Sequence, residues 1–194
     1  MWVGIVPAAG KGERFGGAKL LADVKGEPLL NHTLRSLLDA GVGRVTVVLP
    51  PKDGNGDPAA ALLGSVPLLS DARVVTETNP DPSRGMLSSI QEGLLSAVGE
   101  FFLVLPGDMP FVKPATVKAV VDAATETGTI VSPRHNGRRG HPVAIPGHLR
   151  AAILQAPATS TLAKVLETES ATRIDIDVED AGILRDVDEA SDLQ

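Results

Sequence analysis

The chain has 194 residues, of which 43% are hydrophobic and 22% charged, with a formal net charge of −6 and no cysteine. These values favour one domain over residues 1–194, exclude disulfides and thiolate metal sites, and argue against a nucleic-acid polymer as a partner. No apolar run approaches the ~20 residues that a membrane span needs, and no signal segment opens the chain. We therefore expect a cytoplasmic protein that does not bind membranes.

Apolar runs alternate along the chain with segments of helical periodicity. We predict strands near residues 3–8, 45–49, 73–76, 101–105, 129–132, 142–145, 174–176 and 183–184. We predict helices near residues 28–40, 59–63, 86–98, 115–125, 148–154 and 160–166, and another that begins at 189. In the helix near 86–98, the periodicity predicts four inward side chains: Leu87, Ile90, Leu94 and Leu95.

This alternation is typical of an α/β protein with a mainly parallel sheet. In such sheets, ligands bind beyond the carboxyl ends of the strands. We therefore expect the loops after the first, third and fourth strands to face one crevice.

The loop after the first strand combines glycines with cations. Gly10 and Gly12 alternate with Lys11, and Arg14 and Lys19 follow. Backbone N–H groups from such a loop, together with fixed cations, suit a polyphosphate. The loop lacks the G-x-x-x-x-G-K-[ST] string of a P-loop, and the strand near 45–49 ends without the carboxylate of a dinucleotide fingerprint. An ordinary solvated loop is the alternative.

After an apolar strand that ends in A-A-G, the string G-x-G-x-R-[FM]-G-x-x-K-x-L resembles the signature of nucleotidyltransferases. The resemblance is greatest to the MobA-like NTP transferases, especially those that act as molybdenum cofactor cytidylyltransferases, and it runs from residue 3 to about 193. It implies a three-layer, Rossmann-like nucleotidyltransferase fold with a mainly parallel mixed sheet. It also implies transfer of a nucleoside monophosphate from a triphosphate to a phosphate-bearing acceptor such as molybdopterin cofactor, with release of pyrophosphate. Pro7 is a departure, because these enzymes usually have Leu there.

Two acidic motifs fit a metal site. L-P-G-D-M-P-F-V, residues 105–112, places Asp108 just beyond a buried strand and resembles the family's metal-binding motif. D-V-D-E-A-S-D-L, residues 186–193, resembles the family's D-I-D-T-P-E-D-L and implies that Asp188 is the second metal ligand. Mg²⁺ suits such a site because it takes few carboxylates and completes its shell with phosphate and water. The alternatives are a turn aspartate at 108 and an acidic tail at the C-terminus.

A further segment, N-P-D-P-S-R-G-M-L-S-S, precedes and enters the helix near 86–98 and resembles the family's nucleotide-pocket motif. A purely structural alternative is that Ser83 caps this helix. The resemblance implies that Arg14, Lys19 and Asp108 are catalytic. It implies these nucleotide-binding residues: Ala8, Ala9, Gly10, Lys11, Gly12, Arg14, Lys19, Asn79, Gly85, Ser88 and Ser89.

An arginine-rich segment, R-H-N-G-R-R-G-H-P-V, resembles a part of the cytidylyltransferase-like members that faces the acceptor. The resemblance implies that Arg138, Arg139 and His141 bind the acceptor phosphate. A single histidine beside proline is more often structural, so a structural His141 is the alternative.

The A-A-G string also bears on the base. Relatives that use CTP tend to read A-A-G at this loop, and those that use GTP tend to read A-G-G, so we predict CTP over GTP. Two other functions remain open: an oxidoreductase of the nicotine-pathway quinone reductase type, and a non-catalytic nucleotide sensor on the same fold. Neither the acceptor nor the oligomeric state follows from the sequence.

Overall fold

The structure is a computed structural model that describes residues 1–10, 18–52, 54, 56–168 and 172–193. Its strands are β1 (Trp2–Pro7), β2 (Asp23–Val24), β3 (Glu27–Pro28), β4 (Arg44–Leu49), β5 (Val74–Thr78), β6 (Phe101–Val104), β7 (Ile130–His135), β8 (Arg138–Arg139), β9 (Val143–Pro146) and β10 (Arg173–Asp177). Its α-helices are α1 (Leu29–Asp39), α2 (Pro58–Ser65), α3 (Met86–Ser96), α4 (Pro114–Thr127), α5 (Arg150–Gln155) and α6 (Leu162–Thr168). The predicted α/β class with a mainly parallel mixed sheet is confirmed.

The main sheet has the strand order β10-β7-β9-β6-β1-β4-β5, with β8 paired to β7. β1 pairs in parallel with both β4 and β6, and β5 continues the parallel half beyond β4. β9 runs antiparallel to β6 and β7. The carboxyl ends of β1, β4, β5 and β6 therefore lie along one edge of the sheet.

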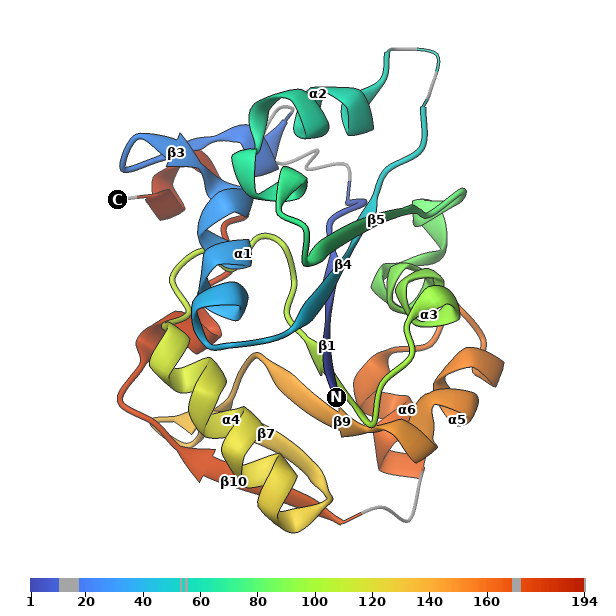
Figure 1. The fold of residues 1–194 in the computed structure, drawn as a ribbon, viewed down its shortest axis with the longest axis vertical. Coiled ribbons are helices and arrows are strands. Elements are labelled where there is room, and N and C mark those ends of the chain that lie inside the picture. Colours follow the sequence, from blue (N-terminus) through green and yellow to red (C-terminus); the bar gives the residue numbers. More distant parts are fainter. Residues whose placement is uncertain (11–17, 53, 55, 169–171, 194) are drawn as a thin grey trace.

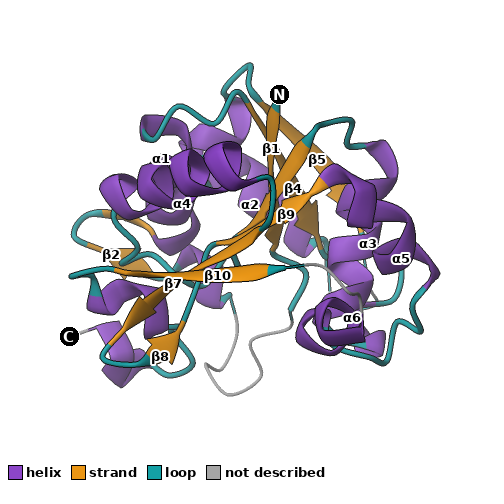
Figure 2. Ribbon diagram, turned by 90° about the horizontal axis from the view of Figure 1, so that it is seen from below, coloured by secondary structure: helices purple, strands orange, loops and turns teal. Residues whose placement is uncertain are grey.

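Helices cover both faces of this sheet. Figure 2 shows α1, α2 and α4 on one side and α3, α5 and α6 on the other. The buried side chains form two clusters that match these layers: one includes Leu34 of α1 and Val117 of α4, and the other includes Leu87 of α3 and Ile153 of α5. The architecture is thus three layers, helix–sheet–helix, as the resemblance implied (Figure 1).

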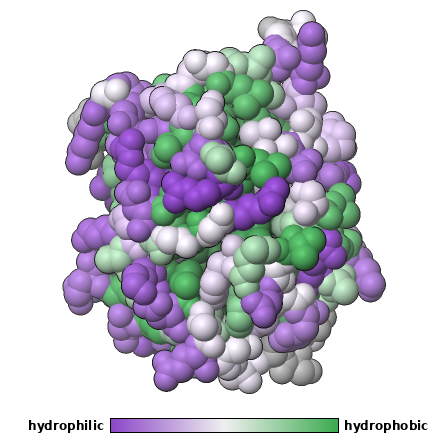
Figure 3. All heavy atoms as spheres, viewed as in Figure 1, coloured by the Kyte–Doolittle hydropathy of each residue, from purple (hydrophilic) through white to green (hydrophobic). Residues whose placement is uncertain are grey.

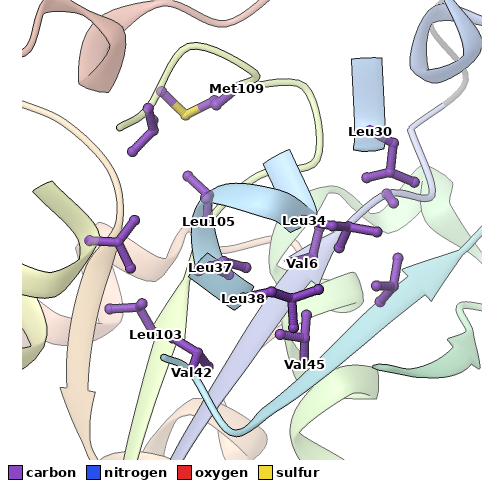
Figure 4. Packing of buried hydrophobic residues seen from close by; sticks show 14 of the residues in the cluster. Val6, Leu30, Leu34, Leu37, Leu38, Val42, Val45, Leu103, Leu105 and Met109 are labelled. Carbon is purple, nitrogen blue, oxygen red and sulfur yellow. The ribbon is translucent and has the colours of Figure 1, made fainter. Parts of the chain in front are cut away.

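The first cluster also holds the loop that follows β6. In Figure 4, leucines of α1 lie between Val6 of β1 and the side chains of Leu105 and Met109. Leu105 and Met109 are both buried, so the segment between them is fixed at both ends by apolar burial. This packing positions Asp108.

The ends of the helices follow known capping rules. α4 has Pro114 in its first turn and ends at Gly128, whose φ of 68° lies in the left-handed region. α2 begins after Asp57, whose side chain accepts a hydrogen bond from the Ala60 N–H. α3 begins at Met86 after the N-cap residue Gly85, whose φ is 101°, and no side chain caps it. The alternative of a cap by Ser83 is therefore wrong.

Three details of the predicted elements are wrong. Residues 183–184 are not a strand but belong to the 3-10 turn Ala181–Leu184, because the Asp180 carboxylate accepts from the Gly182 N–H and tightens the chain there. Leu95 is 61% exposed, because it lies about 100° around α3 from the buried Leu94. The expected final helix is the 3-10 turn Ala190–Leu193.

Figure 3 shows one face of the molecule, on which hydrophobic and hydrophilic side chains are interspersed. Within the described ranges, no helix combines the length and the apolar character that a bilayer crossing requires.

Candidate active site

A pocket opens at the edge of the sheet where the parallel strands end. Its volume is about 150 Å³. It is lined by the loops after β1, β5 and β6, which confirms the crevice expected from the strand order. The lining residues are Pro7, Ala8, Ala9, Gly10, Lys19, Leu20, Pro82, Gly85, Met86, Ser89, Pro106 and Asp108.

Asp108 is held at this edge by contacts of its neighbours. The Gly107 N–H donates to the Pro7 carbonyl at 2.9 Å, and the Thr33 hydroxyl donates to the Gly107 carbonyl at 3.0 Å. A Cβ atom at Gly107 would lie 3.2 Å from the Pro7 carbonyl oxygen, so glycine allows this close approach of the two loops. The Asp108 side chain is 21% exposed and faces the pocket.

Asp188 reaches the same place from the C-terminal arm, which we define as residues 180–193. Asp180 anchors the arm: its buried carboxylate accepts from the Lys113 N–H at 2.9 Å and the Thr116 hydroxyl at 2.7 Å. Further along, the Val187 N–H donates to the Asp108 carbonyl at 3.0 Å. Residues 108 and 188, distant in sequence, are thereby placed side by side.

Lys19 joins the two carboxylates. Its Nζ lies 2.8 Å from Asp108 Oδ2 and 3.2 Å from Asp188 Oδ1. Burial lowers the pKa of Lys19, but the hydrogen bonds and charges of Asp108 and then Asp188 outweigh it and hold that pKa above its ordinary value. Lys19 is therefore fully charged at neutral pH, and it lies at the pocket wall.

The first loop contributes backbone to the pocket. Ala8 and Ala9 are buried, whereas none of the described residues lies within 4 Å of where a Cβ of Gly10 would be. The predicted site residues Lys11, Gly12 and Arg14 lie outside the described residues, and their roles stay predictions.

The residues predicted around the entrance of α3 fall into two groups. Gly85 and Ser89 line the pocket. Asn79 and Ser88 are fully buried behind it, where the Asn79 Nδ2 donates to the hydroxyl oxygens of Ser88 and Ser89. The structure brings all four together in one network but presents only part of it to the pocket.

The residues predicted to bind the acceptor lie apart from the pocket lining. Arg139 is on β8 and donates to the Asp175 carboxylate at 2.7 Å, and Arg138 is exposed beside it. His141 Nδ1 lies 3.4 Å from the Val104 carbonyl oxygen, and burial lowers the pKa of His141 despite the opposing charges of Asp108 and Asp186. His141 is thus uncharged at neutral pH and could serve as a hydrogen-bond partner but not as a cation. The acceptor roles of these three residues stay predictions.

The donor set can hold a hard divalent cation. Among the described residues, no three histidine, cysteine, aspartate or glutamate side chains are grouped as a complete metal site. Asp108 and Asp188 both contact the Lys19 ammonium group, so a cation that replaced this group could meet both carboxylates. Two carboxylates, with substrate phosphate and water, match the way Mg²⁺ is usually bound in nucleotide-dependent enzymes.

Two contributors were missed at the level of sequence. Asp180 anchors the C-terminal arm, and Asp192 accepts hydrogen bonds from the backbone N–H groups of Asp188 and Glu189 at 2.9 and 2.8 Å. Aspartates in turns often bond local backbone N–H groups, so this pattern could have indicated the bonds of Asp192 and the bond of Asp180 to the Gly182 N–H, but not the long-range bonds by which Asp180 anchors the arm.

Comparison with known proteins identifies the family of the chain. The MobA-like NTP transferase domain matches residues 4–174. The chain is 32% identical over 129 residues to a Thermococcus sibiricus protein named "Probable molybdenum cofactor guanylyltransferase", covering 66% of this chain and 59% of the relative. It is 33% identical over 154 residues to 2-C-methyl-D-erythritol 4-phosphate cytidylyltransferase of Streptomyces coelicolor, covering 74% of this chain and 54% of the relative. The matches thus span between half and three fifths of these relatives' own length.

Solved structures agree on the fold. Rv0371c from Mycobacterium tuberculosis H37Rv superposes with a TM-score of 0.82 at 24% identity, covering 98% of this chain and 94% of that one. Its complex with manganese superposes with a TM-score of 0.70 at 21% identity, covering 91% and 88%. A nucleotidyl transferase from Methanothermobacter thermautotroptrophicus superposes with a TM-score of 0.74 at 25% identity, covering 99% and 94%. The chain belongs to the MobA-like NTP transferase family and has the nucleotidyltransferase fold.

Proposed function

We propose that this chain transfers a nucleoside monophosphate, CMP from CTP, to a small phosphate-bearing acceptor such as molybdopterin cofactor, with Mg²⁺ as cofactor and pyrophosphate as the second product. One observation carries the proposal: Lys19, Asp108 and Asp188 form a single ion-paired cluster beside the pocket. A nucleotidyl transfer needs both a place for a divalent cation and a fixed positive charge for the triphosphate.

In this reaction an acceptor phosphate oxygen attacks the α-phosphorus, and the bond from that phosphorus to the bridging oxygen of pyrophosphate breaks. Asp108 and Asp188 would hold the cation, which when bound would neutralise charge on the reacting phosphates. Lys19 would turn from the carboxylates to the triphosphate and neutralise its developing charge. Arg14 is proposed to act beside it, as the resemblance implies. No protein nucleophile is needed, because positioning and charge neutralisation carry the reaction.

The preference for CTP is supported by the A-A-G string and by the burial of Ala9, which is 1% exposed. The methyl group of Ala9 occupies space at the pocket wall that glycine would leave free, and a pyrimidine needs less room than a purine. Relatives bear names of both kinds, cytidylyltransferase and guanylyltransferase, so the base must be tested directly.

The acceptor is proposed to carry a phosphate because the named substrate of the Streptomyces coelicolor relative is a phosphate ester. Arg138, Arg139 and His141 are proposed to bind it. Since Arg139 is bonded to Asp175, acceptor binding by Arg139 would require this ion pair to open.

The experiment is a panel of CTP, GTP, ATP and UTP in Mg²⁺, with molybdopterin cofactor, a phosphosugar and 2-C-methyl-D-erythritol 4-phosphate as acceptors. Release of pyrophosphate and the mass of the product are measured, with Asp108→Asn as the inactive control. We expect a nucleotidylated product, formed fastest with CTP. A preference for GTP would refute the base assignment alone. No pyrophosphate release from any of the four triphosphates, together with thermal stabilisation by NADPH or FAD, would refute transfer and favour the oxidoreductase.

A further inference from the structure

We propose that Asn79 is a positioning residue whose side-chain amide directs the hydroxyl proton of Ser89 into the pocket, toward a lone pair of the bound nucleotide. This inference rests on the proposed function, because it takes the ligand of the pocket to be a nucleoside triphosphate. It differs from a direct nucleotide contact by Asn79, since Asn79 is 0% exposed and does not line the pocket.

Every polar atom of the Asn79 side chain is engaged. Its Oδ1 accepts from the Asp81 N–H at 3.0 Å, and its Nδ2 donates to Ser88 Oγ at 2.8 Å and to Ser89 Oγ at 2.9 Å. The Asp81 N–H requires an acceptor, so it determines which end of the amide carries oxygen. The two N–H bonds of Nδ2 must then both point at the serines.

The backbone of Asn79 is fixed as well. Its N–H donates to the Leu49 carbonyl at 3.0 Å, which ties residue 79 to the end of β4. The amide is therefore held by the sheet, and it holds the two serines in the first turn of α3.

The two serines differ in what remains for their protons. Ser88 Oγ donates to the Gly85 carbonyl at 2.7 Å, so its proton is used inside the protein. Ser89 Oγ accepts from Asn79 and makes no donor hydrogen bond to another of the described residues. A hydroxyl has one proton and two lone pairs. With its oxygen already accepting from Asn79, Ser89 is left with a proton to give, and Ser89 lines the pocket.

The Asn79 amide therefore determines that Ser89 presents a hydrogen-bond donor, and not an acceptor, at this wall of the pocket. Ser89 lies in the first turn of α3, where the helix dipole also favours electron-rich ligand atoms. A phosphate oxygen and a carbonyl oxygen of a base both present such lone pairs. Either one would accept the Ser89 proton.

Asn79→Asp tests this orientation of the Ser89 hydroxyl with little change in the shape of side chain 79. The carboxylate oxygen that replaces Nδ2 accepts instead of donating, so the Ser89 proton turns back to residue 79 and a lone pair faces the ligand. The Asp81 N–H keeps its acceptor. Loss of a hydrogen bond to a neutral or charged acceptor corresponds to about a 10- to 100-fold rise in the Kd for CTP.

The experiment is a double-mutant cycle read by the Kd for CTP in Mg²⁺. We expect Asn79→Asp and Ser89→Ala each to weaken CTP binding by about 10- to 100-fold. In the Ser89→Ala background, Asn79→Asp should weaken CTP binding by at least about 3-fold less than it does in the wild type, because the hydroxyl that it reorients is gone. The added negative charge is present in both backgrounds, so the cycle separates its effect from the orientation of the hydroxyl.

Ser36→Ala is the matched control. It removes another buried serine hydroxyl, which donates to the Thr33 carbonyl in α1 and does not line the pocket, so it should leave the Kd for CTP within about 3-fold. The same cycle with inorganic tripolyphosphate shows which ligand atom accepts the Ser89 proton. If it is a phosphate oxygen, the variants bind both CTP and tripolyphosphate more weakly. If it is an atom of the base, they bind only CTP more weakly. An Asn79→Asp effect that is undiminished without Ser89 would overturn the proposal, as would unchanged CTP binding by Ser89→Ala.

A second measurement covers the case in which Asn79→Asp does not fold. In the wild type, CTP should shift the side-chain amide resonances of Asn79 in a ¹H–¹⁵N spectrum, although Asn79 does not line the pocket. In Ser89→Ala these resonances should stay in place when CTP is added at saturation. Equal shifts in both proteins would overturn the proposal. Wild-type protein that binds CTP but forms no product would refute the proposed function. The mutant cycle and the resonance shifts would still test the role of Asn79, because both depend only on CTP binding.

Discussion

Replacing Lys19 with methionine should make the empty enzyme bind a divalent cation more tightly while slowing transfer. Lys19 and the cation compete for the same two carboxylates, because Nζ lies 2.8 Å from Asp108 and 3.2 Å from Asp188. Methionine keeps most of the volume of the side chain and removes the charge. The two effects have opposite signs, which simple misfolding would not produce.

The two contacts of Lys19 determine how much more tightly the variant should bind the cation. Asp108 is 21% exposed, and a charge-assisted hydrogen bond in such a setting contributes about 1.5–3 kcal/mol. Asp188 is 45% exposed, so solvent screening reduces its contact with Lys19 to about 0–1 kcal/mol. Removal of about 2 kcal/mol of competition corresponds to about 30-fold tighter binding of the cation. Loss of a group that stabilises the transition state should slow transfer by about 10- to 1000-fold.

Mn²⁺ titration followed by electron paramagnetic resonance measures the first effect, and pyrophosphate release measures the second. Lys118→Met is the control, because Lys118 pairs with Asp122 on the exposed side of α4 and its loss removes the same charge elsewhere. Unchanged or weaker Mn²⁺ binding by Lys19→Met would refute the competition, and unchanged turnover would refute the role of Lys19 in transfer.

Three further predictions concern the carboxylates, the C-terminal arm and pH. Asp108→Asn should abolish transfer with the Tm within a few degrees of wild type, and near-normal turnover in Mg²⁺ would contradict a metal role. Gly182→Ala should lower the Tm by about 5–10 °C in calorimetry, because a Cβ there would clash with the Phe111 carbonyl oxygen, whereas a Cβ at Gly64 in α2 would meet none of the described residues within 4 Å, so Gly64→Ala should not destabilise. His141 has a lowered pKa, so folding favours its neutral form. Its stabilisation is therefore present above the ordinary pKa of about 6.5 and lost as pH falls through the lower folded value. His141→Gln should flatten the Tm against pH profile below about pH 6.5, and an unchanged profile would contradict the assignment.

The elements were predictable where local pattern decides them. β1, β4 and β6 are short apolar runs, and their burial needs no knowledge of distant residues. The positions of Lys19 and Asp108 in the loops after β1 and β6 follow from the same local pattern. The predicted strand at 183–184 was wrong because a buried aspartate, not apolar periodicity, shapes that turn.

Contacts between residues that are distant in the chain could not be predicted from local pattern. Arg139 pairs with Asp175 because β8 and β10 both lie beside β7, so this ion pair follows from strand order. Likewise, neighbouring serines in one helical turn look equivalent in sequence, yet Ser88 donates to the Gly85 carbonyl while Ser89 lines the pocket. Hydrogen-bond partners depend on which groups packing brings within about 3 Å, and periodicity carries no such information.

The α/β class, the loops that face the pocket and the motifs that carry the family resemblance could all be predicted from the sequence, because each depends on residues close together in the chain. Only the folded arrangement shows that Asp180 anchors the C-terminal arm and that Asp188 meets Asp108 through Lys19. The same holds for Asn79, which lies behind the pocket wall and not in it. These relations join segments as far apart as residues 19 and 188, and only the packing of the sheet edge brings such segments into contact.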